Sequence, residues 1–295
     1  MAIAGRLIRT LLFVPGNNPR FIEKAKTLRA DIVCLDLEDS VPMDEKDRAR
    51  AMVRDAIRAR KDYVSELYVR VNAPDSGLIG DDLQVVYDGL DGIVIPKVND
   101  AREVIKVAEM LDELEKEHGI GKSIEIMPSI ESARGVVNAY SIASSSDRVS
   151  ALVFGVFDFM HDMGLEYAED AIGFNYARAK IPVDARAAGV YAIDGIWQAV
   201  DDVDGLIRDA MLGMRLGYKG KSIIHPKQIE PVHRVFVPSK DEVEWARKVV
   251  VALEEAMKQG RGAVRLEGRM VDAVHYKRAK ALLEAIGSST DIHGG

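Results

Sequence analysis

The sequence predicts a (β/α)₈ TIM barrel, in the α/β class, and three observations support this fold. First, eight short apolar runs alternate with amphipathic helical stretches, which is the order expected of parallel βα units. Second, most runs are apolar at consecutive positions, as in strands that are covered on both faces. Third, all eight runs fall between residues 7 and 226, a span close to the roughly 250 residues of a typical TIM barrel.

The eight predicted strands cover residues 7–15, 31–39, 66–72, 92–98, 123–131, 149–159, 188–196 and 221–226. The helical stretches between them carry signals for their ends. Asn18 and Pro19 predict an N-cap and a first helical residue. Asp100 and Gly119 mark the two ends of another helix. The competing fold, an open doubly wound sheet, would need a G-x-G-x-x-G turn after its first strand, and the turn VPGNNPR does not match it.

The pattern changes after the eighth strand. Residues 240–260 read as a long amphipathic helix, residues 261–274 as a loop with several glycines, and residues 275–286 as a final helix before a frayed tail. We therefore expect a catalytic barrel domain over residues 1–239 and a C-terminal helical lid segment over residues 240–295.

Composition narrows the class of protein. Hydrophobic residues make up 47% of the chain and charged residues 29%, with a net charge of −7. This balance is ordinary for a soluble globular protein and argues against nucleic-acid binding. No apolar run approaches the roughly 18 residues of a membrane span, and Pro15 and Gly16 end the short N-terminal run that could be mistaken for a signal peptide. The single cysteine, Cys34, lies in an apolar run and is expected in the core. We expect a cytoplasmic protein.

Polar and charged residues follow the apolar runs where the strands should end. In a TIM barrel these ends meet at one rim, where the active site lies. Crowded carboxylates at such a rim need a neutralising cation, and Mg²⁺ prefers carboxylate oxygens. The sequence therefore predicts a magnesium site. The residues at the strand ends are Asp36, Glu38, Asp39, Arg70, Asn72, Lys97, Glu131, Asp158 and His225.

Other catalytic chemistries have weaker support. The six histidines show no zinc-ligand spacing, and the chain contains neither a G-x-S-x-G nucleophile elbow nor a P-loop. A Schiff-base lysine is possible at Lys97, but the surrounding carboxylates would hold its amine in the charged form. An electrostatic or structural role fits this lysine better.

A set of motifs resembles a known family. LLFVPGNNPRFIEKA, LDLEDSV, YVRVN, IPKV, MPSIES, FGVFDF, IHPKQI and LEGRMVDA occur in this order between about residues 7 and 285. Together they resemble the citrate lyase β-subunit-like branch of the HpcH/HpaI aldolase and citrate lyase superfamily. LEGRMVDA points to the CoA-ester lyases of that branch, such as malyl-CoA and citramalyl-CoA lyases.

The resemblance implies Mg²⁺ as the cofactor, an acyl-CoA substrate and a trimer or hexamer of identical subunits. Glu131 and Asp158 would hold the metal, and Asp36, Glu38 and Asp39 would reach it through water molecules. Arg70 would act on the substrate near the metal. Asp272 would be the acid/base, carried by the lid into a neighbouring subunit's site. The implied substrate-binding residues are Arg70, Glu131, Phe13, Lys24, Phe157, His225 and Pro226.

One position departs from the family pattern. Many relatives carry arginine two residues after the glycine of the first-strand turn, and this chain has Asn18 there, with Arg20 nearby. The departure leaves room for a carrier-protein thioester in place of CoA. The resemblance implies cleavage or formation of a 3-hydroxyacyl-CoA into acetyl-CoA and a 2-oxo acid. Two alternatives stay open: a citrate lyase β subunit that works on an acyl-carrier-protein thioester within a complex, and a malyl-CoA thioesterase or malate-synthase-like enzyme. A non-catalytic scaffold is a weaker third reading.

Overall fold

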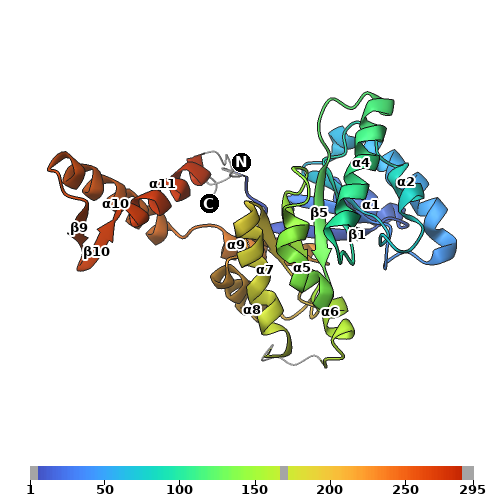
Figure 1. Ribbon diagram of the computed structural model, residues 1–295. Coiled ribbons are helices and arrows are strands. Elements are labelled where there is room, and N and C mark those ends of the chain that lie inside the picture. Colours follow the sequence, from blue (N-terminus) through green and yellow to red (C-terminus); the bar gives the residue numbers. More distant parts are fainter. Residues whose placement is uncertain (1–5, 167–171, 288–295) are drawn as a thin grey trace. The chain divides into compact units, whose positions relative to one another are not determined.

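Eight parallel strands close into a barrel, which confirms the predicted TIM fold (Figure 1). The computed structural model describes residues 6–166 and 172–287. The strand order around the barrel follows the chain, and β8 closes the ring by pairing with β1. The strands are β1 (Thr10–Pro15), β2 (Ile32–Asp36), β3 (Glu66–Arg70), β4 (Gly92–Ile95), β5 (Glu125–Ile130), β6 (Ala151–Phe154), β7 (Tyr191–Asp194) and β8 (Gly220–Ile223).

Helices connect successive strands on the outside of the ring, as Figure 1 shows for α4 and α5 beside β5. This arrangement follows from the sequence, because a strand covered by a helix outside and by other strands' side chains inside is apolar on both faces. The helices of this unit are α1 (Pro19–Ala25), α2 (Lys46–Arg58), α3 (Ile79–Leu83), α4 (Ala101–His118), α5 (Ala133–Ala143), α6 (Val156–Asp162), α7 (Asn175–Ala188), α8 (Val203–Leu216) and α9 (Ile229–Phe236).

The helix-end signals read from the sequence are confirmed. The Asn18 side chain accepts hydrogen bonds from two backbone N–H groups of the first turn of α1. Asp100 caps α4 and forms a reciprocal capping box with Glu103. Gly119 ends α4 with φ of 65°, a left-handed conformation that glycine adopts without strain.

The barrel interior is apolar at its base and polar toward the carboxyl ends of the strands. The inward-facing apolar cluster is fully or almost fully buried and includes Cys34, as expected. Its members are Ile8, Leu11, Ile32, Cys34, Tyr68, Val94, Met127, Ala151, Val153 and Ile193, with Phe13 and Tyr191 packed against them. The buried Asp36, Ser129 and Glu131 follow on the same strands or directly after them. The charged groups therefore lie toward the carboxyl ends of the strands, next to a buried apolar core.

Seven of the eight predicted strands extend past the observed strand ends, and two of these differences place a predicted strand-end residue in a helix or in a 3₁₀ cap. The sixth strand stops at Phe154, and α6 begins at Val156, so Asp158 lies in the first turn of a helix. The eighth strand stops at Ile223, and His225 caps a short 3₁₀ turn over Pro226–Gln228. Apolar periodicity does not distinguish a buried strand from the apolar helix start that follows it.

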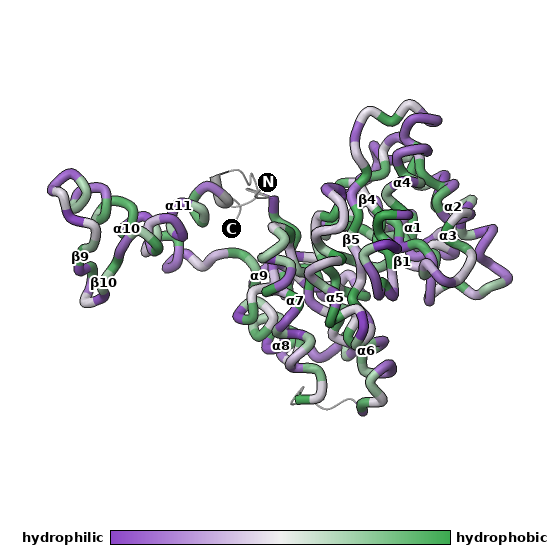
Figure 2. Tube along the Cα trace, in the orientation of Figure 1, coloured by the Kyte–Doolittle hydropathy of each residue, from purple (hydrophilic) through white to green (hydrophobic). Residues whose placement is uncertain are grey.

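A second unit comprises the residues from Phe236 onward together with the described N-terminal residues up to Leu7. It contains α10 (Lys240–Lys258), an antiparallel hairpin of β9 (Ala263–Leu266) and β10 (Arg269–Asp272), and α11 (Ala273–Gly287). Figure 2 shows hydrophobic and hydrophilic stretches alternating along α10 and α11, and the apolar sides pack into a small core of their own. None of the helices in the described ranges has the length and hydropathy that a membrane span requires.

The hairpin replaces the loop expected over residues 261–274. Leu266 pairs with Arg269, which leaves a two-residue turn of Glu267 and Gly268. Both turn residues have positive φ, 47° and 82°, the geometry that suits the twist of a tight hairpin. Asn-Gly and Asp-Gly are the usual sequence signals for such a turn. Glu-Gly is a weaker signal, and the sequence therefore reads as a loop at this point.

Candidate functional site

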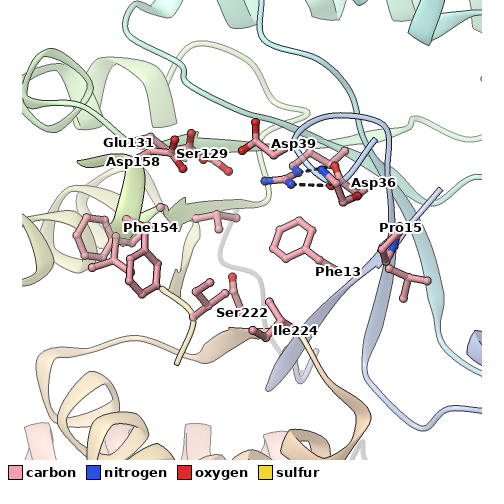
Figure 3. A pocket seen from close by; sticks show the side chains of 18 residues that line it. Phe13, Pro15, Asp36, Asp39, Ser129, Glu131, Phe154, Asp158, Ser222 and Ile224 are labelled. Atoms are coloured by element: carbon pink, nitrogen blue, oxygen red, sulfur yellow. Dashed lines mark hydrogen bonds and ion pairs between the residues drawn. The ribbon is translucent and has the colours of Figure 1, made fainter. Parts of the chain in front are cut away.

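A cavity of about 440 Å³ lies at the carboxyl ends of the barrel strands. Figure 3 shows that its two sides differ in chemistry. Carboxylates gather on one side, from Asp39, Glu131 and Asp158, with the Asp36–Arg70 pair beside them. The facing side carries apolar groups, among them Phe13, Phe154 and Ile224, together with the hydroxyl of Ser222. The cavity can therefore receive a small molecule with one strongly polar end.

Asp36 and Arg70 form a two-bond ion pair at the edge of the cavity. They end neighbouring strands and are register partners. Arg70 Nε donates to Asp36 Oδ1 at 2.6 Å and Arg70 Nη2 donates to Oδ2 at 2.7 Å. Burial by itself would raise the pKa of Asp36, but the charge and hydrogen bonds of Arg70 outweigh it and hold the pKa below its usual value. Phe13 lies under the guanidinium, with its ring centre 4.8 Å from Arg70 Cζ.

Lys97 supports the acidic side with both its side chain and its backbone. Its Nζ lies 2.6 Å from Glu38 Oε1 and 3.2 Å from Asp39 Oδ1. Its φ is 54°, a left-handed value that residues with a Cβ seldom adopt. In this conformation the backbone N–H donates to Glu131 Oε2 at 3.2 Å. Burial would lower the pKa of Lys97, but the hydrogen bond and charge of Glu38 raise it above its usual value, which favours an electrostatic role over a Schiff base.

Glu131 and Asp158 differ from the other carboxylates around the cavity. Arg70 and Lys97 pair with Asp36, Glu38 and Asp39. Within the described ranges, by contrast, Glu131 accepts only the backbone hydrogen bond from Lys97, and the carboxylate of Asp158 has no protein partner. Burial, together with the negative charges of Glu38 and Asp158, raises the pKa of Glu131 to about 8. These two acidic side chains are the ones available to an added cation.

The site fits a hard cation that keeps most of its ligands as water and substrate. Among the described residues, no group of three or more His, Cys, Asp or Glu side chains is arranged to hold a metal by itself. Mg²⁺ is commonly bound through one or two carboxylates, with water and substrate oxygens completing its octahedron. Two carboxylates without an ion-pair partner beside an open cavity meet this requirement. A cation there would offset the burial and the negative charges of Glu38 and Asp158 that raise the pKa of Glu131.

Gly155 makes room for the Glu131 carboxylate. A Cβ at this position would lie 2.4 Å from Glu131 Cγ and 2.7 Å from Glu131 Oε1. Because φ of Gly155 is −94°, the backbone there would accept any residue. The glycine is therefore required by the neighbouring carboxylate and not by the backbone conformation.

We expect Gly155→Ala to weaken Mg²⁺ binding about tenfold or more, because the added methyl must displace a carboxylate that we assign to the metal. Isothermal titration with Mg²⁺ measures the effect. Gly121→Ala is the matched control, since a Cβ there meets nothing within 4 Å. Equal Mg²⁺ affinity in the two variants would show that Glu131 does not depend on this space.

The structure brings most of the predicted site residues together, and a few lie elsewhere. Phe13 and Phe157 line the cavity with Arg70, Glu131 and Asp158. Glu38 lies behind them, joined to Arg70 and Lys97. Three predicted channel residues are outside the lining: Lys24 is exposed on α1, and His225 and Pro226 are half-buried after β8. Their contact with an acyl-CoA chain stays a prediction.

Asp272 belongs to the second unit, at the junction of β10 and α11. Its Oδ1 accepts hydrogen bonds from the backbone N–H groups of Val274, at 3.0 Å, and His275, at 3.3 Å, and lies 2.7 Å from His275 Nδ1. The hydrogen bonds of His275 lower the pKa of Asp272 below its usual value. The carboxylate is thus held in one orientation at the start of the helix. Its role as an acid/base stays a prediction.

Sequence reasoning did not single out several residues that form the cavity. Gly155 and Ile196 line it, and so do the buried Ser129 and Ser222. The alternation of inward and outward residues along a strand could have placed both serines inside the barrel. It could not have shown that they reach the cavity, because that depends on the stagger of the strands around the ring.

Comparisons with known proteins identify the family to which the chain is related. The HpcH/HpaI aldolase/citrate lyase profile matches residues 9–226. A citrate lyase subunit beta from Leuconostoc mesenteroides subsp. cremoris is 39% identical over 282 residues, covering 95% of this chain and 93% of the relative. A (3S)-malyl-CoA thioesterase from Cereibacter sphaeroides is 33% identical over 285 residues, covering 96% of both. The crystal structure of CitE from Mycobacterium tuberculosis, in complex with magnesium, acetoacetate and coenzyme A, matches with 29% identity and a TM-score of 0.77, covering 97% of this chain and 100% of that one.

Proposed function

Because the chain belongs to the HpcH/HpaI aldolase/citrate lyase family, we propose that it is a Mg²⁺-dependent carbon–carbon lyase. Its substrate is a short 3-hydroxyacyl-CoA such as malyl-CoA or citramalyl-CoA, which it cleaves to acetyl-CoA and a 2-oxo acid or forms from them. The observation that supports this most is that two carboxylates, Glu131 and Asp158, have no ion-pair partner among the described residues, beside a cavity whose other acids are paired with Arg70 and Lys97.

The division of charge on the cavity wall matches the needs of the reaction. Bound by Glu131 and Asp158, Mg²⁺ would supply positive charge to the oxygens of the 2-oxo acid half of the substrate. Arg70 holds a fixed positive charge at the rim and would stabilise the negative charge that develops on the thioester oxygen. Asp36 and Phe13 orient that guanidinium through the ion pair and the ring contact.

The acetyl half of the substrate needs a proton at its terminal carbon, and we assign that transfer to Asp272. In this proposal residues 240–295 act as a lid that carries Asp272 to the site of a neighbouring subunit, so the active form is a homo-oligomer, either a trimer or a hexamer. Phe13, Lys24, Phe157, His225 and Pro226 would contact the acyl-CoA chain.

A second candidate function has a specific observation in its favour. The citrate lyase subunit beta is a more similar relative, at 39% identity, than the thioesterase, at 33%. Asn18 also stands where many relatives carry a CoA-directed arginine. The chain would then act on an acyl-carrier-protein thioester as one subunit of a larger complex. The thioesterase relative supports a third possibility, in which this chain hydrolyses the thioester bond of its substrate.

A coupled assay separates these functions. The purified protein is incubated with malyl-CoA or with (S)-citramalyl-CoA, with Mg²⁺ and with EDTA, while glyoxylate, pyruvate and free thiol are followed. Magnesium-dependent release of a 2-oxo acid without free thiol supports the lyase. Free thiol together with malate or citramalate identifies a thioesterase. If neither ester reacts, the carrier-protein function is favoured, and the same assay is repeated with a phosphopantetheine-bearing partner.

Binding of Mg²⁺ should depend on pH. Since the pKa of Glu131 is raised to about 8 in the metal-free protein, this carboxyl holds a proton at neutral pH and must lose it when a cation binds. We expect the affinity for Mg²⁺ to rise as pH increases toward 8 and then to level off. Titration calorimetry in buffers with different protonation enthalpies should give about one proton released per Mg²⁺ near pH 6.5 and nearly none near pH 9. The same number of protons released at both pH values would contradict the assignment of Glu131 as a ligand of Mg²⁺.

A further inference from the structure

Lys46, the first residue of α2, is a buried lysine that the proposed function does not use. It is only 6% exposed, and this burial lowers its pKa below the usual value. Its Nζ donates to Leu37 O at 2.5 Å, to Glu38 O at 2.8 Å and to Asn72 Oδ1 at 2.8 Å. All three protons of the ammonium therefore go to uncharged oxygens. Because a buried charge is strongly unfavourable without such hydrogen bonds, the ammonium and the two carbonyls hold one another in place.

The two carbonyls belong to a loop, residues 37–41, that follows β2 and folds around the Asp36 carboxylate. The backbone N–H of Glu38 donates to Asp36 Oδ1 at 2.9 Å. The backbone N–H of Ser40 donates to Asp36 Oδ2 at 3.1 Å. The carboxylate thus binds the N–H groups of the loop, and the Lys46 ammonium binds its carbonyl oxygens. Two opposite charges, from two different elements, fix the path of this loop.

Both acids that hold Arg70 depend on this loop. Asp36, which directly precedes it, accepts two hydrogen bonds from the guanidinium, from Nε and Nη2. Glu38, within the loop, has its Oε2 at 3.2 Å from Arg70 Nη1. Every nitrogen of the guanidinium therefore faces a carboxylate whose position follows the loop. Lys97 fixes the side chain of Glu38, whereas Lys46 fixes the backbone that carries it.

We propose that Lys46 is a positioning residue: by fixing residues 37–41, it keeps Asp36 and Glu38 where they orient the Arg70 guanidinium at the cavity. The inference rests on the proposed function, because Arg70 acts there on the thioester oxygen. That charge is needed most in the transition state, when negative charge develops on the oxygen. A loosened guanidinium should therefore lower turnover more than it lowers the affinity for the substrate.

Lys46→Met tests the proposal, because methionine keeps an unbranched apolar stem and removes the ammonium. The variant should fold, since each of the two carbonyls keeps a second hydrogen bond. Leu37 O accepts from Asn72 Nδ2 at 3.1 Å. Glu38 O accepts from the backbone N–H of Val41 at 3.0 Å.

Ile57→Ala is the matched control for a loss of stability alone. Ile57 lies in the last turn of the same helix, is fully buried and does not line the cavity. It is about three helical turns from Lys46, so its truncation weakens the packing of α2 without removing a contact to residues 37–41. Thermal denaturation gives the melting temperature of both variants.

Hydrogen exchange, followed by mass spectrometry, measures the order of the loop without any substrate. Four backbone N–H groups of the loop donate to protein acceptors in the unmodified protein, those of Leu37, Glu38, Ser40 and Val41. In Lys46→Met we expect exchange over residues 37–41 to become about tenfold faster or more, and exchange in α4 to stay the same. Ile57→Ala should not single out the loop. An equal rise in the loop and in α4, or no rise in the loop, overturns the role of Lys46.

Steady-state kinetics with malyl-CoA or (S)-citramalyl-CoA and saturating Mg²⁺ measures the effect on turnover. We expect Lys46→Met to lower kcat by about tenfold to a hundredfold and to change KM by less than about threefold. Ile57→Ala should change neither constant well below its melting temperature. An unchanged kcat, a KM that changes as much as kcat, or an equal loss of kcat in Ile57→Ala overturns the proposal. If the unmodified protein turns over neither ester, the proposed lyase function fails and the catalytic effect of Lys46 fails with it, whereas hydrogen exchange still decides whether Lys46 holds the loop.

Discussion

Glu131→Gln and Asp158→Asn are each expected to lower magnesium-dependent turnover by about a thousandfold, the largest effect predicted for any residue of the site. Each substitution keeps the size of the side chain and removes a group that can become a carboxylate ligand of the cation. The physical reason lies in the pairing of the cavity carboxylates. Asp36, Glu38 and Asp39 are paired with Arg70 and Lys97, so among the described cavity residues no third unpaired acid can replace Glu131 or Asp158.

Turnover and Mg²⁺ affinity are measured together for these variants. Asp147→Asn removes an equal charge from an exposed turn and should behave like the unmodified protein. Because Glu131 is buried and carries a proton at neutral pH without metal, Glu131→Gln should not destabilise the metal-free protein. Normal Mg²⁺-dependent rates in both carboxylate variants would show that the metal binds elsewhere.

The second large effect is expected from Arg70→Met, which should impair both folding and catalysis. Asp36 is 1% exposed, and Arg70 supplies both hydrogen bonds that tie its carboxylate to the neighbouring strand. Removing one partner of a buried pair leaves an uncompensated charge, and we expect the free energy of unfolding to fall by about 3–5 kcal/mol. Turnover should fall by about a hundredfold or more, because the charge assigned to the thioester oxygen is lost.

The free energy of unfolding of the Arg70→Met variant should change with pH in the opposite direction to that of the unmodified protein. In the unmodified protein the pKa of Asp36 is lowered, so its contribution to stability is present above the pKa of the unfolded chain and is lost as pH falls through the lower, folded value. Without Arg70, burial dominates and the pKa of Asp36 rises. The variant should therefore become less stable as pH increases above the pKa of the unfolded chain. Thermal denaturation at several pH values measures this trend, and a flat profile would contradict the pairing.

The double variant Arg70→Met/Asp36→Asn separates the two roles of Arg70. A neutral amide at position 36 leaves no unpaired charge, so part of the lost stability should return. Turnover should stay low, because no cation remains near the thioester oxygen. Recovery of both properties together would mean that Arg70 acts only by holding the fold.

The sequence by itself determined the architecture and the zone of the active site. Consecutive apolar residues in eight runs, separated by amphipathic helices with clear caps such as Asn18 and Asp100, have few stable arrangements other than a closed parallel barrel. Once the barrel is predicted, the residue that follows each strand must lie at one rim. Asp36, Arg70, Lys97 and Glu131 could therefore be placed together before any coordinates were known.

Only the tertiary structure decided how those residues differ. It moved Asp158 from a strand end to the first turn of α6, paired three carboxylates with Arg70 and Lys97, and left Glu131 and Asp158 without an ion-pair partner among the described residues. It also placed Ser222 in the wall of the cavity. The physical reason is that pairing depends on strand stagger and on side-chain contacts between residues far apart in the chain. A one-dimensional pattern shows which strand end a residue occupies, but it does not show which neighbour neutralises it.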